Sequence, residues 1–437
     1  MVAHALRGES LVPLDRLEVN NIHCFGGCVV LEEAARRYGL AELLAPLAPR
    51  SGALVRAMIF GGLLNPPSVA PFFLEARTAR LAMFCGLDPD KERFDTADLT
   101  AALKDLDERW THVRDLLVRP PRTEIRAITM FRTSHSGKHT EMDALGFDVE
   151  GIPLPLITEE GAKAEASMEA ILGQIASRSK AGQPLMALDE ETAEAMDLDR
   201  LERQPYLTYL IDLAPESLAA LLRQLNQAQL HDALQTGGPV EVRHHGKRHI
   251  LTPAGVSLEA QTQESQMRVG SLKELASITA GKGADAPVPA RLAHGGPLAI
   301  GAFRGLATNL PPERLSAAAA MQWALRAQAA RAAFSPTQIV MGRPPSGEGV
   351  LMWRNHRNLQ FLTHRLRCHL HAEWSALGET RPVEDVLRDL QEVHRATLTV
   401  DGVVVRRLAT HPSKAVSALL ERLNLWSLFE TPECGRK

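Results

Sequence analysis

The chain has 437 residues, enough for two or three units that each bury a hydrophobic core. Its 45% hydrophobic and 23% charged residues are typical of a globular protein in water, and many Ala and Leu with few aromatics favour helix over sheet. A formal net charge of -3 excludes a global basic field, so contact with nucleic acid would depend on local basic patches. No apolar run reaches the length of a membrane span, and the first residues lack a signal-peptide core. We therefore expect a cytoplasmic protein without a membrane partner.

The cysteines form no framework of paired spacings, which argues against disulfides and secretion. They are Cys24, Cys28, Cys85, Cys368 and Cys434. The motif HCFGGC at 23–28 offers half of a metal site, through His23, Cys24 and Cys28. A structural zinc site needs a second pair of ligands, and none follows at the usual spacing. Small buried thiols are the favoured interpretation.

Residues 20–118 carry helical signals, interrupted at Gly39 and at Asn65-Pro66-Pro67, where a helix cannot continue. Near the end of this region an apolar stripe recurs at helical spacing and indicates a buried face. The stripe consists of Leu99, Leu103, Leu106 and Trp110. We expect an N-terminal helical domain over residues 1–120.

After Pro120-Pro121 the periodicity changes to short apolar runs separated by polar or Gly residues. EIRAITMF, MDALGFDV and IPLPLIT predict three consecutive strands. An amphipathic helix over 163–180, the strand QPLMALD, a helix over 193–203 and the strand PYLTYLIDL follow. The order β-β-β-α-β-α-β over residues 121–213 predicts an α/β fold, with a mixed sheet flanked by helices.

Residues 214–310 break this rhythm and predict a β-rich insertion. It would contain a hairpin in PVEVRHHGKRHILTP that turns at Gly246, a helix over 265–281 and a strand over 295–303. Long helices return over 312–334 and 350–377, so residues 311–376 would complete the core. The tail, residues 377–437, predicts a helix, a pair of strands and a last helix.

Taken in order, several segments resemble the insertion-sequence transposases of the DDE type. They are LLNPPSVAPFF at 63–73, the helix DTADLTAALKDLDERWTHVRDLL, GKHTEMDALGFDVEGIPLPL at 137–156, LMALDEET at 185–192, SQMRVGSLKELASI and RLRCHLHAEWSAL. The resemblance covers roughly residues 25–430. It implies an RNase H-like catalytic core with a β-rich insertion before the last catalytic helix, and a function in DNA transposition.

The family's chemistry is metal-assisted phosphoryl transfer, in which Asp, Asp and Glu hold two divalent ions about 4 Å apart. Hard oxygen ligands of this kind suit Mg²⁺ or Mn²⁺. The resemblance places the first Asp on the first strand, before a Thr-Ser pair, where this chain has Phe131 or a neighbour. The second corresponds to Asp189. The Glu falls on the late helix, at Ala330 or Arg331.

Only Asp189 supplies a carboxylate at these positions. One carboxylate cannot hold two metal ions, and Arg331 would add positive charge where cations bind. We therefore expect a transposase-family protein that binds DNA at transposon ends, with metal-dependent cleavage weak or lost. The resemblance also implies a homo-oligomer as a partner state. The alternative is an interaction or scaffold protein with no nucleic-acid role.

Other readings of the acidic residues remain open. Asp189 is equally compatible with a cap on the turn that follows its strand. Glu190 and Glu191 could rebuild a metal site beside it. His364 and Cys368, four residues apart, offer a weak zinc motif, and Ser134 beside His135 offers a weak nucleophile pair, although adjacent strand residues point to opposite faces.

Two basic segments are candidates for phosphate contact, the main source of affinity for nucleic acid. The first is RHHGKRH at 243–249, and the second is the helix around 354–371, whose basic residues spread over more than one face. The candidate DNA-binding residues are Arg243, Lys247, Arg248, Arg354, Arg357 and Arg365. For the first segment, a solvated turn is the competing interpretation.

Overall fold

A computed structural model describes the chain over residues 17–24, 26–64, 96–117, 125–135, 139–155, 184–195, 208–222, 239–244, 246–253, 303–334, 349–400, 403–409 and 412–429. The chain divides into two compact units. The first comprises Met1–Arg109, Val340–Gly342 and His369–Lys437. The second comprises Trp110–Ile339 and Arg343–Cys368.

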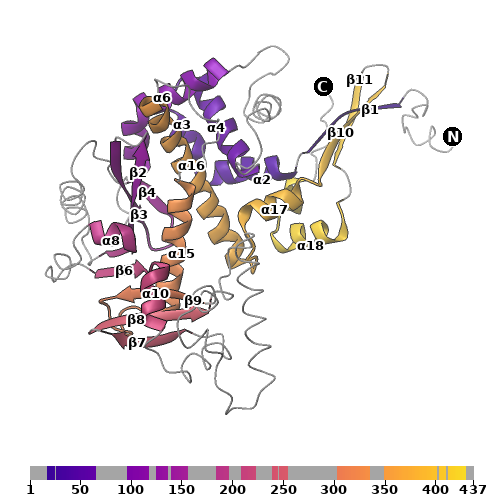
Figure 1. Cartoon of the computed structure of the whole chain (residues 1–437). Coiled ribbons are helices and arrows are strands. Elements are labelled where there is room, and N and C mark those ends of the chain that lie inside the picture. Colours follow the sequence, from indigo (N-terminus) through magenta and orange to yellow (C-terminus); the bar gives the residue numbers. More distant parts are fainter. Residues whose placement is uncertain are drawn as a thin grey trace. The chain divides into compact units, whose positions relative to one another are not determined.

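The second unit is built on a mixed sheet that has eight strands among the described residues, in the order β4-β3-β2-β5-β6-β9-β8-β7 (Figure 1). The strands are β2 (Ala127–His135), β3 (His139–Phe147), β4 (Pro153–Pro155), β5 (Leu185–Asp189), β6 (Thr208–Asp212), β7 (Val240–His244), β8 (Lys247–Pro253) and β9 (Phe303–Thr308). The predicted α/β class is therefore confirmed.

The pairing within this sheet follows the predicted strand order. Strands β2, β3 and β4 form an antiparallel meander, and β5 then lies parallel to β2, with β6 parallel to β5. Strands β5 and β6 are buried except at their last residues, which explains why their sequences are apolar runs rather than alternating ones. Parallel strands end at the same edge of a sheet, so their terminal residues, Asp189 and Asp212, are brought side by side.

The hairpin β7-β8 turns at Gly246, as predicted, where a φ of 76° favours glycine. The segment around it is not separate from the core sheet, because β9 pairs with both β8 and β6. The strand predicted over 295–303 is described only from Phe303, and it continues to Thr308. The helices predicted over 163–180 and 265–281 lie outside the described residues.

Helix α15 (Ala317–Ala333) lies against β2, β5, β6 and β9. It begins at Ser316, whose Oγ accepts the N–H of Ala319. Its buried residues are all alanines: Ala320, Ala324, Ala327, Ala330 and Ala333. The larger side chains Trp323 and Leu325 are only half-buried, and Phe334, which follows the helix, is buried. Small side chains let the helix approach the sheet closely.

The remaining helices of the second unit are α8 (Glu190–Ala195) and α10 (Pro215–Leu222). Two longer helices contribute residues to both units: α6 (Thr96–Leu117) and α16 (Gly349–Ala376). The predicted stripe on α6 is buried at its first three leucines, while Trp110 is half-buried with its ring edge-on to Phe361.

The first unit contains helices and a small antiparallel sheet. Its elements are β1 (Leu17–Cys24), α2 (Gly26–Arg37), α3 (Leu40–Leu44), α4 (Pro49–Leu64), α17 (Val383–Leu390), β10 (His394–Val400), β11 (Val403–Ala409), α18 (Lys414–Arg422) and the 3-10 turn η4 (Trp426–Leu428). The predicted break at Gly39 is confirmed, and α4 ends at Leu64, while the predicted break at Asn65-Pro66-Pro67 lies outside the described residues. Among the described residues, no helix combines the length and apolarity needed to cross a membrane.

The strand β1 corrects the prediction that the chain is helical from residue 20. It pairs with β10, so a purely helical N-terminal region is wrong at this point. The register shifts between Asn20 and His23. Such a bulge displaces the apolar alternation by one residue, from Leu17 and Val19 to Ile22, and so hides the period-two signal of a strand.

Candidate functional site

The candidate site lies where β5 and β6 end in the second unit. Asp189 is the last residue of β5 and pairs with Asp212, the last residue of β6. Asp189 Oδ1 accepts the N–H of Thr192 at 2.8 Å, which caps the start of α8. The capping role considered for Asp189 is therefore observed, and it occupies one carboxylate oxygen.

The other oxygen of Asp189 faces Arg331 of α15. Arg331 Nε lies 3.3 Å from Asp189 Oδ2, and its Nη2 lies 3.6 Å from Asp212 Oδ2. Its Nη1 also approaches Thr129 Oγ1 of β2 at 3.5 Å. Asp212 is further held by Arg304 of β9, whose Nε and Nη2 donate to its two oxygens at 3.1 and 2.6 Å. We call these five residues the Asp–Arg cluster.

The cluster is only partly removed from water, because the side chain of Asp189 is 36% exposed. The side chain of Arg331 is 14% exposed, and that of Asp212 is 21% exposed. Burial lowers the pKa of Arg331, while the carboxylates of Asp189 and Asp212 act to raise it. Arginine nevertheless remains charged in proteins, so the guanidinium neutralises the carboxylates around it.

Two of the positions implied by the transposase resemblance, Asp189 and Arg331, meet here. Thr129 of β2 pairs with Ala187 of β5, and Phe131 and Asp189 each lie two residues further along these strands. The Phe131 side chain lies outside the described residues. Of the two candidates on the late helix, Ala330 is fully buried against the core, and Arg331 is the one that reaches Asp189.

This arrangement does not fit a pair of divalent ions. A two-metal site needs several carboxylates directed at the cations. Here a guanidinium already lies between two carboxylates, and its charge would repel a metal ion. Across the part of the chain that the structure describes, no group of three His, Cys, Asp or Glu side chains is placed to hold a metal.

Glu190 does not rebuild a metal site. Its carboxylate accepts the backbone N–H of Ala214 and the hydroxyl of Ser217, both at the start of α10. Glu190 therefore caps a neighbouring helix. The idea that it joins Asp189 as a ligand is wrong.

Sequence reasoning missed Asp212 and Arg304. A signal for Asp212 was present, because TYLID repeats the pattern of LMALD, an apolar strand that ends in Asp. Nothing in the sequence marked Arg304 as its partner. That pairing depends on β9 joining the sheet next to β6.

Of the six candidate DNA-binding residues, the structure leaves few available. Arg248 is buried, and it donates to Glu241 and to the carbonyls of Leu310 and Leu315. Arg365 donates to the Pro153 carbonyl at 2.6 Å, and burial lowers its pKa. Both are structural residues, which corrects their prediction as phosphate contacts.

The other candidates are more accessible or are not described. Arg243 is exposed on β7, and Lys247 is half-buried at the start of β8. Arg357 is half-buried on α16, and the side chain of Arg354 lies outside the described residues. The hairpin tip therefore retains Arg243 and Lys247 as candidate contacts.

The weak zinc motif on α16 is a buried histidine beside a cysteine. His364 Nε2 lies 3.6 Å from Cys368 Sγ, and the His364 ring packs edge-on to Phe334. No third ligand accompanies them among the described residues. Burial, with a smaller effect of Arg367, lowers the pKa of His364 to about 3. The imidazole is therefore neutral at physiological pH.

The buried His364 predicts a loss of stability in mild acid. In the unfolded chain the imidazole takes up a proton below about pH 6.5, whereas in the folded chain it does so only near pH 3. The free energy of unfolding should fall between these values, by up to about 1.4 kcal/mol per pH unit. Urea unfolding from pH 7 to pH 4 measures this slope.

The matched controls are His364→Leu and His112→Leu, the second at an exposed position of α6. The first should flatten the acid dependence, and the second should leave it unchanged. An unchanged slope in His364→Leu would show that other groups cause the acid sensitivity.

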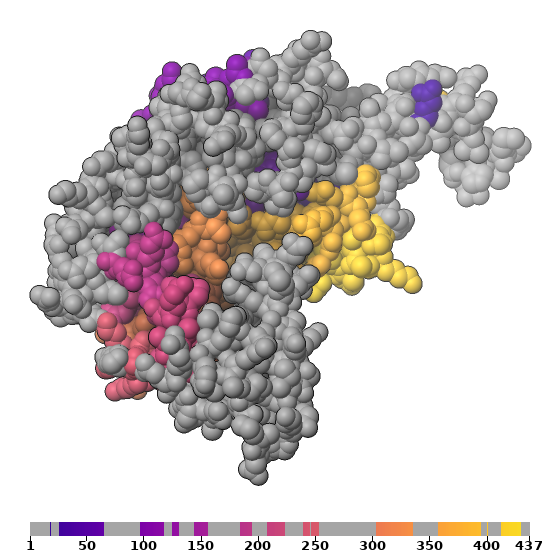
Figure 2. Space-filling model, in the orientation of Figure 1, coloured from indigo at the N-terminus to yellow at the C-terminus, as the bar shows by residue number. Residues whose placement is uncertain are grey.

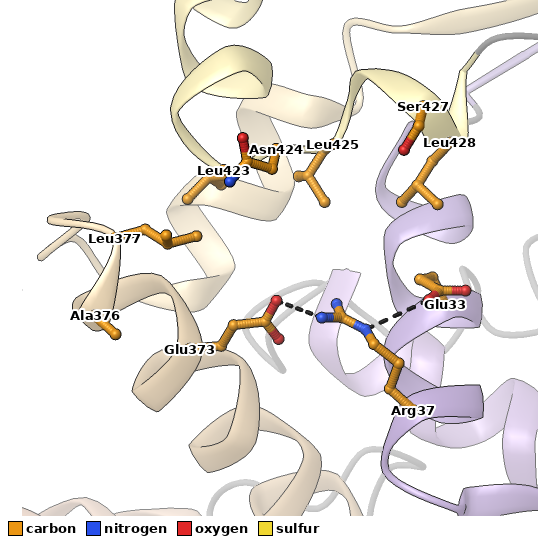
Figure 3. A pocket seen from close by; sticks show the side chains of 10 residues that line it. All are labelled: Glu33, Arg37, Glu373, Ala376, Leu377, Leu423, Asn424, Leu425, Ser427 and Leu428. Carbon is orange, nitrogen blue, oxygen red and sulfur yellow. Dashed lines mark hydrogen bonds and ion pairs between the residues drawn. The ribbon is translucent and has the colours of Figure 1, made fainter.

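A pocket of about 430 Å³ lies in the first unit, between α2, the end of α16 and the segment from α18 to η4 (Figure 3). One wall is polar, where Arg37 Nη1 donates to Glu373 Oε1 at 2.5 Å and Arg37 Nε lies 3.5 Å from Glu33. The facing wall is apolar, and includes Leu423 and Leu425. Because arginines already neutralise both carboxylates, the pocket offers a ligand mainly apolar surface.

The segment between α18 and η4, which lines the apolar wall of this pocket, contains an unusual backbone conformation. Asn424 has a φ of 54°, in the left-handed region that Asn tolerates better than most residues. It reverses the chain after α18 and brings Leu425 and Leu428 over the pocket.

Comparison of the chain with protein-family models, with curated proteins and with solved structures finds no match.

Proposed function

We propose that this chain is a transposase-family protein of the DDE type, with an RNase H-like core, that binds DNA without cutting it. The observation that carries the proposal is the ion pair between Arg331 and Asp189. It lies where the first strand, the strand after the crossover and the late helix meet, and those are the three elements that bear the catalytic acids in the resembling family.

Two further features support the proposal. Strand β2 lies next to β5 and parallel to it, and α15 lies across both, as the resemblance requires. The charge at the late-helix position is reversed rather than merely absent, because Arg331 replaces a Glu. An internal cation can hold Asp189 and Asp212 in place permanently, so the fold keeps its shape without metal ions.

DNA contact by this protein is assigned to the tip of the β7-β8 hairpin, where Arg243 is exposed and Lys247 is half-buried. Binding through phosphates releases counterions, so affinity falls steeply with salt. A plot of the logarithm of the binding constant against the logarithm of the salt concentration falls with a slope of about 0.9 per phosphate contacted.

The test is binding of the full chain to a labelled DNA duplex over a series of NaCl concentrations. The proposal predicts measurable binding at low salt and a slope of several units. The double variant Arg243→Gln, Lys247→Gln should lower that slope by about 1–2. No binding at any salt concentration would favour the alternative, an interaction or scaffold protein without a nucleic-acid role.

A further inference from the structure

A second arginine of α15 is held in an unusual way. Arg326 packs its guanidinium over the ring of Trp323, with Cζ 4.9 Å from the ring centroid. The guanidinium also lies against Gly151, in the turn between β3 and β4, where an added Cβ would displace this flexible end of the Arg326 side chain. Gly151 has a φ of 81°, a backbone conformation that favours glycine.

The turn that holds Arg326 is itself rigid. Asp148 Oδ1 accepts the N–H groups of Glu150 and Ile152, each at 2.9 Å, and Gly151 N–H donates to the Asp148 carbonyl. Val149, at the tip of this turn, is 57% exposed, the largest exposed fraction among the large hydrophobic side chains that the structure describes. Arg326 therefore packs against a hydrogen-bonded turn, and the same turn carries an exposed apolar side chain.

Arg326 differs from the other fixed arginines of this unit in its hydrogen bonding. Arg248, Arg304, Arg331 and Arg365 each direct N–H groups at carboxylates, carbonyls or a hydroxyl. Within the described residues, Arg326 has neither an ion pair nor a hydrogen bond, although Glu150 lies in the adjoining turn. Its stacked faces fix the plane, while the N–H groups at its edge remain unused.

We propose that Arg326, with Trp323 beside it and Val149 in the turn against which it packs, is a preformed contact for the phosphate backbone of DNA. A guanidinium matches two phosphate oxygens at once, and stacking on an aromatic ring reduces the entropy lost on binding. Val149 would pack against the adjoining sugar. In Figure 2, atoms of the orange segment that contains α15 lie at the molecular surface. The inference rests on the proposed function, since it assigns a surface to the same partner.

The test compares Arg326→Gln with Arg314→Gln in the full chain. Arg314 is exposed just before α15 and lacks the ring and the glycine turn around Arg326. We expect Arg326→Gln to weaken binding to a labelled DNA duplex about five- to tenfold at low salt, and to reduce the salt slope by about 1. Arg314→Gln should change affinity less than about twofold. Arg326→Lys should keep the slope but bind more weakly than the wild type.

Near-ultraviolet circular dichroism and thermal unfolding show whether Arg326→Gln keeps the native fold. If it does not, Val149→Ser replaces it, and should weaken binding a few-fold without changing the salt slope. If the wild type binds DNA and Arg326→Gln binds it no more weakly than Arg314→Gln does, this inference is overturned but the proposed function is not. This inference would also be overturned if Arg326→Gln abolished binding to a polyglutamate peptide but left DNA binding intact. The surface around Arg326 would then bind an acidic protein and not DNA. No DNA binding by the wild type would instead overturn the proposed function and this inference with it.

Discussion

Replacing Ala330 with Glu is expected to lower the free energy of unfolding by at least about 4 kcal/mol. Ala330 has no exposed surface and lies on the alanine face of α15, against the sheet. A larger side chain in such a packed position costs about 1–3 kcal/mol, and burial of an unpaired carboxylate costs several more. Urea unfolding followed by circular dichroism measures the loss.

The matched control is Gln328→Glu, at an exposed position two residues earlier on the same helix. It adds the same carboxylate to the surface and should change stability by less than about 0.5 kcal/mol. If Ala330→Glu unfolds at the same urea concentration as this control, the described packing of α15 against the sheet is wrong.

Replacing Arg331 with Leu is expected to destabilise the chain by about 2–3 kcal/mol. The change leaves the partly exposed carboxylate of Asp189 without its cation, while Asp212 keeps Arg304. It also removes the packing of the buried Arg331 side chain. Equilibrium unfolding in urea at pH 7 gives the value.

A double variant separates the charge effect from the loss of packing. Asp189→Asn keeps the oxygen that caps α8 but removes the charge. Combined with Arg331→Leu, it should recover about 1–2 kcal/mol of the loss. A double variant that is no more stable than Arg331→Leu would mean that Arg331 stabilises the fold through packing alone.

The strands of the sheet could be predicted well from local sequence where they are continuous runs of apolar residues. LMALD and the meander from EIRAITMF to IPLPLIT have strand lengths, apolar content and turn residues that local patterns reveal. The strand β1 could not be predicted, because its partner β10 lies more than 370 residues away in the sequence and a bulge interrupts its alternation. Long-range pairing leaves little trace in a local pattern.

The candidate site was predictable in its position but not in its chemistry. The resemblance placed the late-helix residue at 330 or 331, yet only the burial of Ala330 decides between them. The sequence showed that acids were missing. It did not show that Arg331 bridges Asp189 and Asp212, or that Glu190 caps α10, because these contacts depend on how separate elements meet.

A plasmid-nicking assay on the purified full chain with Mn²⁺ tests most directly whether the guanidinium of Arg331 takes the place of divalent ions beside Asp189. If it does, we expect no nicking above the buffer control, under salt conditions in which the protein binds the plasmid. Nicking that requires Mn²⁺ and that disappears in Asp189→Ala would contradict this expectation, because Asp189 would then hold a metal despite Arg331.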